Sequence, residues 1–197
     1  TIFRFWNEGL LKSFLIEITA DILCRADGIS GDPLIDFVDD AAEQTGTGRW
    51  LVSEAMALGV PAPTIAEAVA ARSLSGGRNV RQAIEKIAPE LDEEIALSVD
   101  DIRDALLATV LTCYAQGFAV LSAGAEKYGW PHREAETARI WQAGCIIRAD
   151  LLTTIRHAYL EQPNLPHLFV KDDIAAFVSG ATKGWRPAVA GAISAGL

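Results

Sequence analysis

The sequence predicts an all-α fold, a compact multi-helix domain without a sheet. Apolar residues recur at spacings of three and four over most of the chain, whereas the apolar–polar alternation of a half-buried strand is nearly absent. Half of the 197 residues are hydrophobic and 22% are charged, which is typical of a folded globular protein rather than a disordered chain. A chain of this length can bury one good core, so we expect a single domain over residues 1–197.

Glycine and proline residues divide the first half of the chain into helices and connections. Gly28 and Gly31 stop the first apolar face, and Gly59 stands where a left-handed residue ends a helix. Residues 60–63 (VPAP) are expected to be extended, because each proline pushes its predecessor out of the α region. The expected segments are one long helical face at 6–22, a short helix at 33–42 behind the N-cap Asp32, a loop at 44–48, and helices at 49–58, 64–74 and 80–87.

The longest helix is expected in the second half, behind a capping box. Ser98 provides the N-cap hydroxyl and Asp101 the acid three residues later, where Glu is more usual. The helix runs to about Tyr128, and Gly129 with the following Trp-Pro breaks it. The remaining expected segments are an acidic connector at 89–94, two helices at 133–159 or one interrupted at Gly144, a turn at 164–166, and helices at 171–179 and 187–194.

The charge and the cysteine content indicate which partners the protein is not expected to bind and in which cellular compartment it is expected. The formal charge is −9 and no Lys/Arg stripe is present, which argues against nucleic acid and anionic membranes as partners. No apolar run is expected to reach the ~18 residues that span a bilayer, and no signal-peptide pattern opens the chain. Cys24, Cys113 and Cys145 are interpreted as buried free thiols of a reducing, cytoplasmic environment.

The loop Gln44-Thr45-Gly46-Thr47-Gly48 carries the best indication of chemistry. Two glycines flank a hydroxyl and a helix follows at once, so backbone N–H groups are exposed where an anion can approach. Thr47 adds a donor, and the nearby cations are Arg49 and Arg72. On shape alone a plain turn between helices is the simpler interpretation, since the loop is not G-x-G-x-x-G and follows no strand.

Other sites have little support in the sequence. His132, His157 and His167 show no metal-binding spacing, so we expect no metal site. No G-x-S-x-G elbow is present. The carboxylate runs at 39–40 and 92–94 are interpreted as solvated faces, because acid–base pairs need an apolar setting that neither run offers.

Several stretches match one family pattern in order and spacing over almost the whole chain. They are SFLIEITA at 13–20, GTGRW at 46–50, LGVPAPTIAEAV at 58–69, ARSLS at 71–75, YAQGF at 114–118, ARIW at 138–141 and GCIIRA at 144–149. Together they resemble the C-terminal half of the 6-phosphogluconate dehydrogenase family.

The resemblance implies an oxidoreductase that oxidatively decarboxylates 6-phosphogluconate to ribulose 5-phosphate with NADP, a step of the pentose phosphate pathway. It implies a homodimer in which this helical domain binds substrate and forms the dimer interface. The substrate phosphate is held at positions matching Thr47 and Arg72, and a hydroxyl and a guanidinium both donate to phosphate oxygens. The family's Rossmann domain, catalytic lysine and glutamate, and C-terminal tail are expected to lie outside these 197 residues. We therefore assign no catalytic residue here and expect the chain alone to be inactive.

The sequence departs from the family pattern beside the phosphate. Thr45 stands where the family has a lysine that contacts the phosphate, Glu43 replaces a small residue, and a second arginine of the motif at 139–142 is lost. We take Thr45, Gly46, Thr47, Gly48 and Arg72 as the substrate-binding residues. Two alternatives stay open: a divergent paralogue acting on another hydroxy acid, and a helical dimerisation module that no longer binds substrate.

Overall fold

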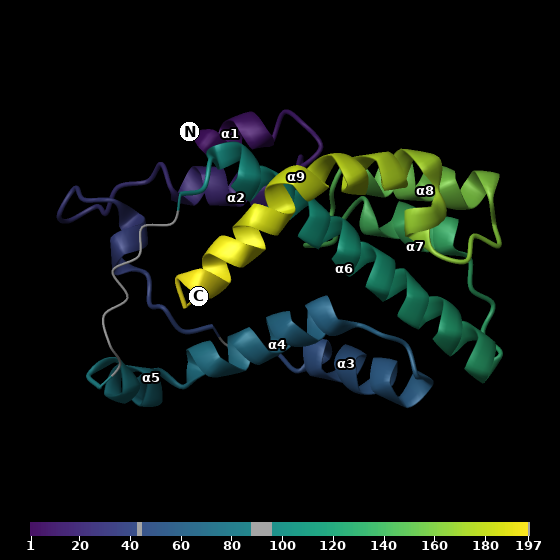
Figure 1. Ribbon diagram of the computed structural model, residues 1–197, viewed down its shortest axis with the longest axis horizontal. Coiled ribbons are helices and arrows are strands. Elements are labelled where there is room, and N and C mark those ends of the chain that lie inside the picture. The colour runs from purple at the N-terminus through teal and green to yellow at the C-terminus, as the bar shows by residue number, and fades with distance from the viewer. Residues whose placement is uncertain (43–44, 88–95, 197) are drawn as a thin grey trace. The chain divides into compact units, whose positions relative to one another are not determined.

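The computed structural model describes residues 1–42, 45–87 and 96–196, and it is helical throughout (Figure 1). Helices take up 68% of the described residues and no strand occurs among them, so the predicted all-α fold class is confirmed. The helices are α1 (Ile2–Trp6), α2 (Phe14–Ile22), α3 (Thr47–Leu58), α4 (Pro63–Gly76), α5 (Arg78–Glu85), α6 (Val99–Tyr128), α7 (Glu134–Trp141), α8 (Leu151–Glu161) and α9 (Asp172–Ser194), with 3₁₀ turns at Leu34–Phe37 and Leu168–Val170.

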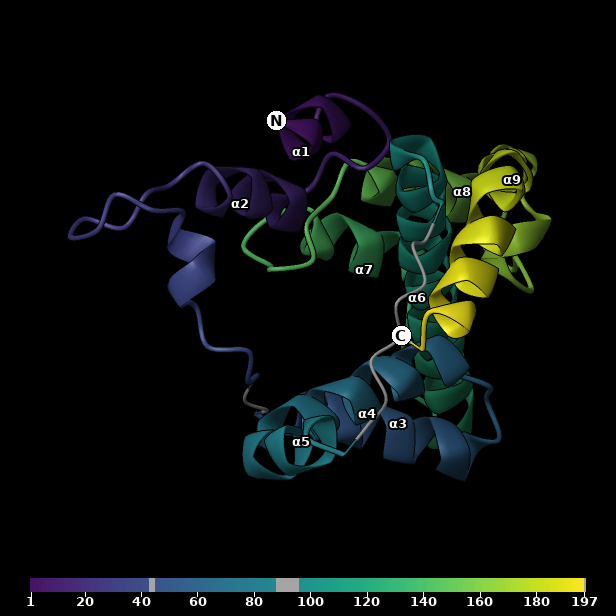
Figure 2. The ribbon, with the colours of Figure 1, turned by 60° about the vertical axis from the view of Figure 1, so that its left-hand side comes forward.

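Within the single predicted domain the structure distinguishes two compact units. The first comprises Thr1–Asp39 and Arg133–Ala175, and the second comprises Asp40–His132 and Ala176–Leu197. In the first unit α1 packs on α2 and α7 packs on α8. In the second unit α3 packs on α4 and α6, and α4 also contacts α5. Figures 1 and 2 both show α3 lying alongside α4, which is the pair that matters for the candidate site.

Several helix ends are where local signals place them. The Ser98 hydroxyl accepts a hydrogen bond from the Asp101 N–H, and the Asp101 carboxylate accepts one from the Ser98 N–H, so the capping box is confirmed. Gly59 ends α3 and Gly129 ends α6, both in the left-handed region. These signals succeed because the groups that form each cap are neighbours in sequence.

Two expected elements at the start of the chain are wrong. The single face at 6–22 is two helices, because Ser13 caps α2 by accepting from the Ile16 N–H while its own N–H donates to Asn7. The helix expected at 33–42 is only the 3₁₀ turn Leu34–Phe37. Val38 is extended, and residues 40–42 use their polar groups in contacts with α4 and α5 instead.

In the second half, the two-helix interpretation of 133–159 is confirmed, with Gly144 in the left-handed region between the helices. The two helices expected at 171–194 are one, because α9 continues through Pro187 at the cost of one intrahelical hydrogen bond. Its Gly184 lies so close to α6 that an added Cβ would stand 2.7 Å from the Asp101 Cα. The acidic connector at 89–94 lies outside the described residues.

Two further expectations are wrong: that no apolar run reaches the length of a membrane span, and that the three cysteines are buried. Helix α6 is long and apolar enough to cross a membrane by length and composition, since residues 105–125 carry no charge; 44% of its most apolar window is buried within the structure. One such helix is weak evidence for a membrane span, because the core helix of a soluble protein passes the same test. Among the cysteines, Cys24 is exposed, and Cys113 and Cys145 are only half-buried.

Candidate functional site

The predicted loop lies at the start of α3, on the exposed surface of the second unit. Gly46 is the N-cap and adopts the left-handed region with φ of +94°. No side chain caps the helix and its first turn contains no acid, so its N-terminal N–H groups present an uncompensated positive end. The Thr45 and Thr47 hydroxyls lie 3.5 Å apart, and a Cβ on Gly46 would stand 3.7 Å from Nη2 of Arg49.

Glycine 48 sets how closely this loop approaches α4. A Cβ added to Gly48 would lie 2.9 Å from Cγ2 of Val69, which is shorter than real Cβ contacts. Valine has one strongly preferred side-chain rotamer in a helix, so Val69 has little freedom to turn away. The absence of a side chain at position 48 therefore lets the first turn of α3 pack directly on α4.

Arg72 lies on α4 between two contacts with the chain segment that contains the loop. Val69, three residues before it, contacts Gly48. Ser75, three residues after it, accepts a hydrogen bond from the Ala42 N–H at 3.0 Å and donates to the Arg72 carbonyl at 3.1 Å. Three residues correspond to a rise of about 4.5 Å along a helix. The segments on either side of positions 43–44 thus contact α4 one turn before and one turn after Arg72.

A charged brace holds the segment that precedes the loop. Arg81 of α5 donates from Nη1 to the Asp40 carboxylate at 2.6 Å and from Nη2 to the Ser75 carbonyl at 2.9 Å. Arg78 adds a longer ion pair to Asp40 at 3.7 Å. The Arg81 guanidinium, with help from Arg78, holds the pKa of Asp40 below its ordinary value. The sequence analysis interpreted Asp40 as part of a solvated face and so missed this brace, which joins residues 41 positions apart.

The other end of α4 is fixed by Gln116, the only polar residue buried in the described core. Its Oε1 accepts from the Ile65 N–H at 3.2 Å, and its Nε2 donates to the Thr64 hydroxyl at 3.1 Å. Ala62, the N-cap of α4, offers no side-chain hydrogen bond. An amide from α6 therefore supplies the cap that the local sequence lacks, and it fixes the helix that carries Arg72.

The structure brings the predicted residues Thr45, Gly46, Thr47 and Gly48 together at one helix start and packs that start against the helix bearing Arg72. Glu43 and Gln44 lie outside the described residues. Arg72 and Glu67 are five residues apart on α4, which is not the spacing of three or four at which helical side chains face each other. Within the described ranges no group of three His, Cys, Asp or Glu is arranged to hold a metal ion. His167 accepts from the Phe169 N–H and begins a 3₁₀ turn.

The geometry is that of an uncapped helix start packed on a second helix, and comparison with known proteins identifies the scaffold. The family model described as 6-phosphogluconate dehydrogenase, C-terminal domain, matches residues 1–197. The chain belongs to this family. The resemblance read from the motifs is therefore confirmed.

Curated relatives and a solved structure agree over the whole chain. The chain is 40% identical over 202 residues to 6-phosphogluconate dehydrogenase, decarboxylating 1, of Saccharomyces cerevisiae, covering 100% of this chain and 41% of the relative. It is 39% identical over 202 residues to the NAD(+)-dependent decarboxylating enzyme of Bacillus subtilis, covering 100% of this chain and 43% of the relative. A solved Plasmodium falciparum 6-phosphogluconate dehydrogenase matches with a TM-score of 0.89 and 34% identity, covering 99% of this chain and 43% of that one.

The relatives are longer than this chain, which matches one domain of them. The chain spans about two fifths of the length of the curated relatives it matches. The Plasmodium enzyme has been described in its apo form, with NADP+ and with 6-phosphogluconate, whereas the Bacillus relative is named for NAD(+). The family thus includes members named for each of the two nicotinamide dinucleotides.

Proposed function

We propose that the protein to which this domain belongs oxidises and decarboxylates 6-phosphogluconate with a nicotinamide dinucleotide, and that this domain binds the substrate phosphate. The observation that carries the proposal is the Gly48–Val69 contact, which packs the uncapped start of α3 against the helix bearing Arg72. The similarity to decarboxylating 6-phosphogluconate dehydrogenases over the whole chain supports the choice of substrate.

In this proposal each group of the loop has a separate part. The Thr47 hydroxyl and the first N–H groups of α3 donate to phosphate oxygens, where the helix dipole also favours negative charge. Arg72 adds a charge-assisted, bidentate donor from α4. Gly46 leaves room for the phosphate to approach the backbone, and Gly48 lets the start of α3 pack on α4. Thr45 adds a second hydroxyl 3.5 Å from that of Thr47.

The cofactor is proposed to be NADP, bound mainly by a Rossmann domain outside these 197 residues. When bound it accepts hydride from the substrate, and the residues of this chain hold the phosphate end and thereby orient the sugar acid. The ratio of kcat/KM for NADP and NAD in the intact protein tests the cofactor. A ratio that favours NAD would contradict NADP while leaving the phosphate assignment standing.

The phosphate assignment is tested by restoring a cation at position 45 of the intact protein. Thr45→Lys is expected to lower the KM for 6-phosphogluconate by roughly tenfold to a hundredfold, because a hydrogen bond to a charged group is worth about 1.5–3 kcal/mol. Thr47→Val is expected to raise KM, since it removes a donor while keeping the side-chain shape.

A matched control separates a local contact from a general gain of positive charge. Ser53→Lys adds the same charge to an exposed position further along α3 and should leave KM unchanged. An unchanged or raised KM for Thr45→Lys would contradict the phosphate site at this loop. Activity on a non-phosphorylated hydroxy acid with no response to Thr45→Lys would favour a divergent paralogue. An absence of both binding and activity would favour a dimerisation module.

We also propose that the protein is a cytoplasmic homodimer. Many large apolar side chains are exposed on the isolated chain, including Ile29 at 98%, Ile87 at 83% and Met56 at 78%. Contact with a second copy of the chain would remove part of this apolar surface from water. Light scattering of the intact protein at micromolar concentration is expected to give the mass of a dimer, and a clean monomer would refute the proposal.

A further inference from the structure

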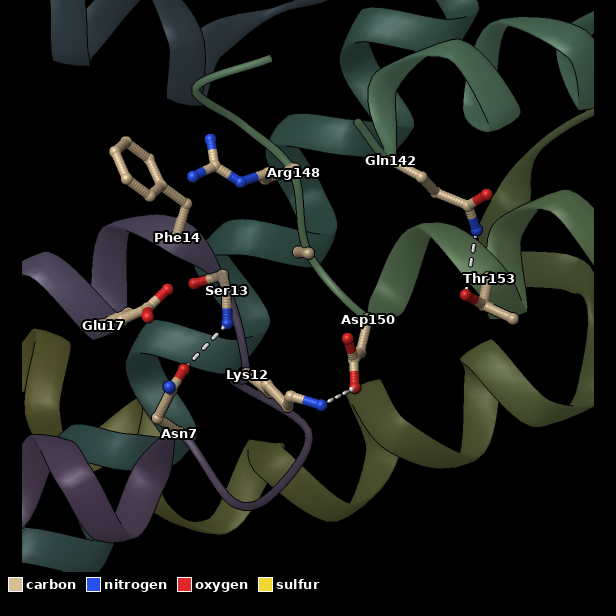
Figure 3. Close-up of a pocket in the computed structure, with 10 residues that line it drawn as sticks. Asn7, Lys12, Ser13, Phe14, Glu17, Gln142, Arg148, Asp150 and Thr153 are labelled. Carbon is tan, nitrogen blue, oxygen red and sulfur yellow. Dashed lines mark hydrogen bonds and ion pairs between the residues drawn. The ribbon is translucent and has the colours of Figure 1, made fainter. Parts of the chain in front are cut away.

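A polar pocket lies within the first unit, where two distant chain segments pair. Ser13 and Ala149 form an isolated antiparallel bridge, in which the Phe14 N–H donates to the Arg148 carbonyl at 3.1 Å and the Asp150 N–H donates to the Lys12 carbonyl at 3.0 Å. The pairing shapes a cavity of about 420 Å³ (Figure 3). Cavities of several hundred Å³ are of a size that takes small-molecule ligands.

Arg148 presents an available donor edge at this pocket. Its guanidinium carbon lies 3.6 Å from the ring centroid of Phe14, and its Nη1 donates to the Cys145 carbonyl at 3.1 Å (Figure 3). These two contacts hold the guanidinium plane in place. Among the described residues nothing accepts from Nε or Nη2, and this pair of parallel donors matches the two oxygens of a carboxylate.

The remaining charges of the pocket limit the ligand to a small net charge. Lys12 and Asp150 neutralise each other in an ion pair of 3.2 Å. Glu17 lines the same pocket, and its carboxylate has no hydrogen-bond or ion-pair partner within the described part of the chain. With Lys12 and Arg148 positive and Glu17 and Asp150 negative, the lining is neutral overall. A monoanion that also brings hydroxyl donors for Glu17 fits this balance better than a multiply charged phosphate.

Neutral hydrogen-bonding groups complete the lining. Gln142 donates from Nε2 to the Thr153 hydroxyl at 2.9 Å, which leaves the Gln142 Oε1 to accept and the Thr153 hydroxyl hydrogen to donate. Ser13 accepts from the Ile16 N–H at 3.3 Å, so its hydroxyl hydrogen is also available. Figure 3 shows the Gln142–Thr153 pair and Glu17 on opposite sides of Ser13, so the lining offers polar groups on both sides of Ser13.

We propose that this pocket binds a small polyhydroxy monocarboxylate, a sugar acid without phosphate. Its carboxylate lies on the Nε–Nη2 edge of Arg148, and its hydroxyls donate to Glu17 and Gln142 and accept from Ser13 or Thr153. The site goes beyond the proposed substrate subsite, because every lining residue belongs to the first unit and the loop at 45–48 belongs to the second.

Calorimetry on the intact protein with three probes tests the proposal. Gluconate has both features, glucitol lacks the carboxylate, and acetate lacks the hydroxyls, so gluconate is expected to bind most tightly. Hydrogen–deuterium exchange with gluconate should slow in peptides covering residues 7–17 and 142–153, which locates the binding. Ser53→Lys, at an exposed position on α3 in the second unit, is the control and should leave gluconate binding unchanged.

Two variants test the lining groups. Arg148→Lys keeps the positive charge but removes the pair of parallel donors Nε and Nη2. It is expected to weaken gluconate binding about tenfold. Glu17→Gln is an exposed, unpaired position and should not disturb folding; it is expected to lower the preference for gluconate over acetate by roughly twofold to tenfold. If Arg148→Lys does not fold, Glu17→Gln alone tests whether the pocket binds gluconate. Equal binding of gluconate and acetate, or no slowed exchange in the two peptides, would overturn the proposal whatever Thr45→Lys does.

Discussion

Gly48→Ala provides the sharpest test of how α3 is placed against α4. The new Cβ would lie 2.9 Å from Cγ2 of Val69. Carbon atoms in good contact are about 3.5–4.0 Å apart, so the two helices must separate by about 0.6–1 Å or Val69 must leave its rotamer. Overpacking of this kind lowers the free energy of unfolding by about 1–3 kcal/mol, whereas replacing a glycine in a helix by alanine raises it by at most about 1 kcal/mol. We therefore expect a net loss of up to about 3 kcal/mol in the free energy of unfolding.

The substitution also has a functional consequence under the proposed function. Separation of α3 from α4 moves Thr47 away from Arg72, and small misplacements of binding groups cost activity. The KM for 6-phosphogluconate should therefore rise in Gly48→Ala. Urea unfolding of the intact protein measures the stability change, and steady-state kinetics measure KM.

A double-mutant cycle isolates the contact. Val69→Ala removes the clashing methyl groups, so Gly48→Ala made in that background is expected to be less destabilising by about 1–3 kcal/mol than in the wild type. Gly117→Ala on α6 is the matched control, because no heavy atom lies within 4 Å of its added Cβ. If Gly48→Ala is as harmless as Gly117→Ala and shows no coupling to Val69, the close approach of α3 to α4 is refuted.

Three further substitutions test the scaffold by urea unfolding. Gly184→Ala places a Cβ 2.7 Å from the backbone of Asp101, which cannot rotate away, so a loss of at least about 1–3 kcal/mol is expected; Gly180→Ala, with open space around it, should be tolerated. Gln116→Leu leaves the Ile65 N–H without its acceptor and should cost about 1–3 kcal/mol, whereas Thr64→Val removes only the second partner and should cost less. Asp101→Asn weakens the capping box, and its effect depends on pH. Hydrogen bonds from Ser98 lower the Asp101 pKa below its ordinary 3.8, so the stability they confer is present above about that pH and is lost as pH falls through the folded pKa. Wild type and Asp101→Asn should thus differ at pH 7 and converge on acidification, and a stability difference that does not shrink between pH 7 and pH 3 would contradict the linkage.

Local signals predicted much of the fold, because some structural information is carried by neighbours in sequence. The cap at Ser98 and the helix ends at Gly59 and Gly129 are set by groups within four residues of one another, although α3 begins at Thr47, two residues before its expected start. The same logic failed where a distant contact outweighed a local preference. Val38 is extended and no helix continues to Ala42, because Asp40 and Ala42 bind α5 and α4.

Some features of the candidate site were also predicted from the sequence, and others depend on contacts between distant residues. The sequence by itself identified the glycine-flanked Thr47, the cations nearby and, through motifs in order, the family. That Thr47 and Arg72 belong to packed helices depends on Gly48 against Val69 and on Gln116 reaching across from α6. The pocket of Ser13 and Arg148 joins segments about 135 residues apart, and no local pattern marks it. Residues near in sequence determined helix ends such as those at Ser98, Gly59 and Gly129, since those hydrogen bonds close within about one turn. The tertiary structure decided which side chains meet, because only packing brings distant donors, acceptors and charges within contact distance.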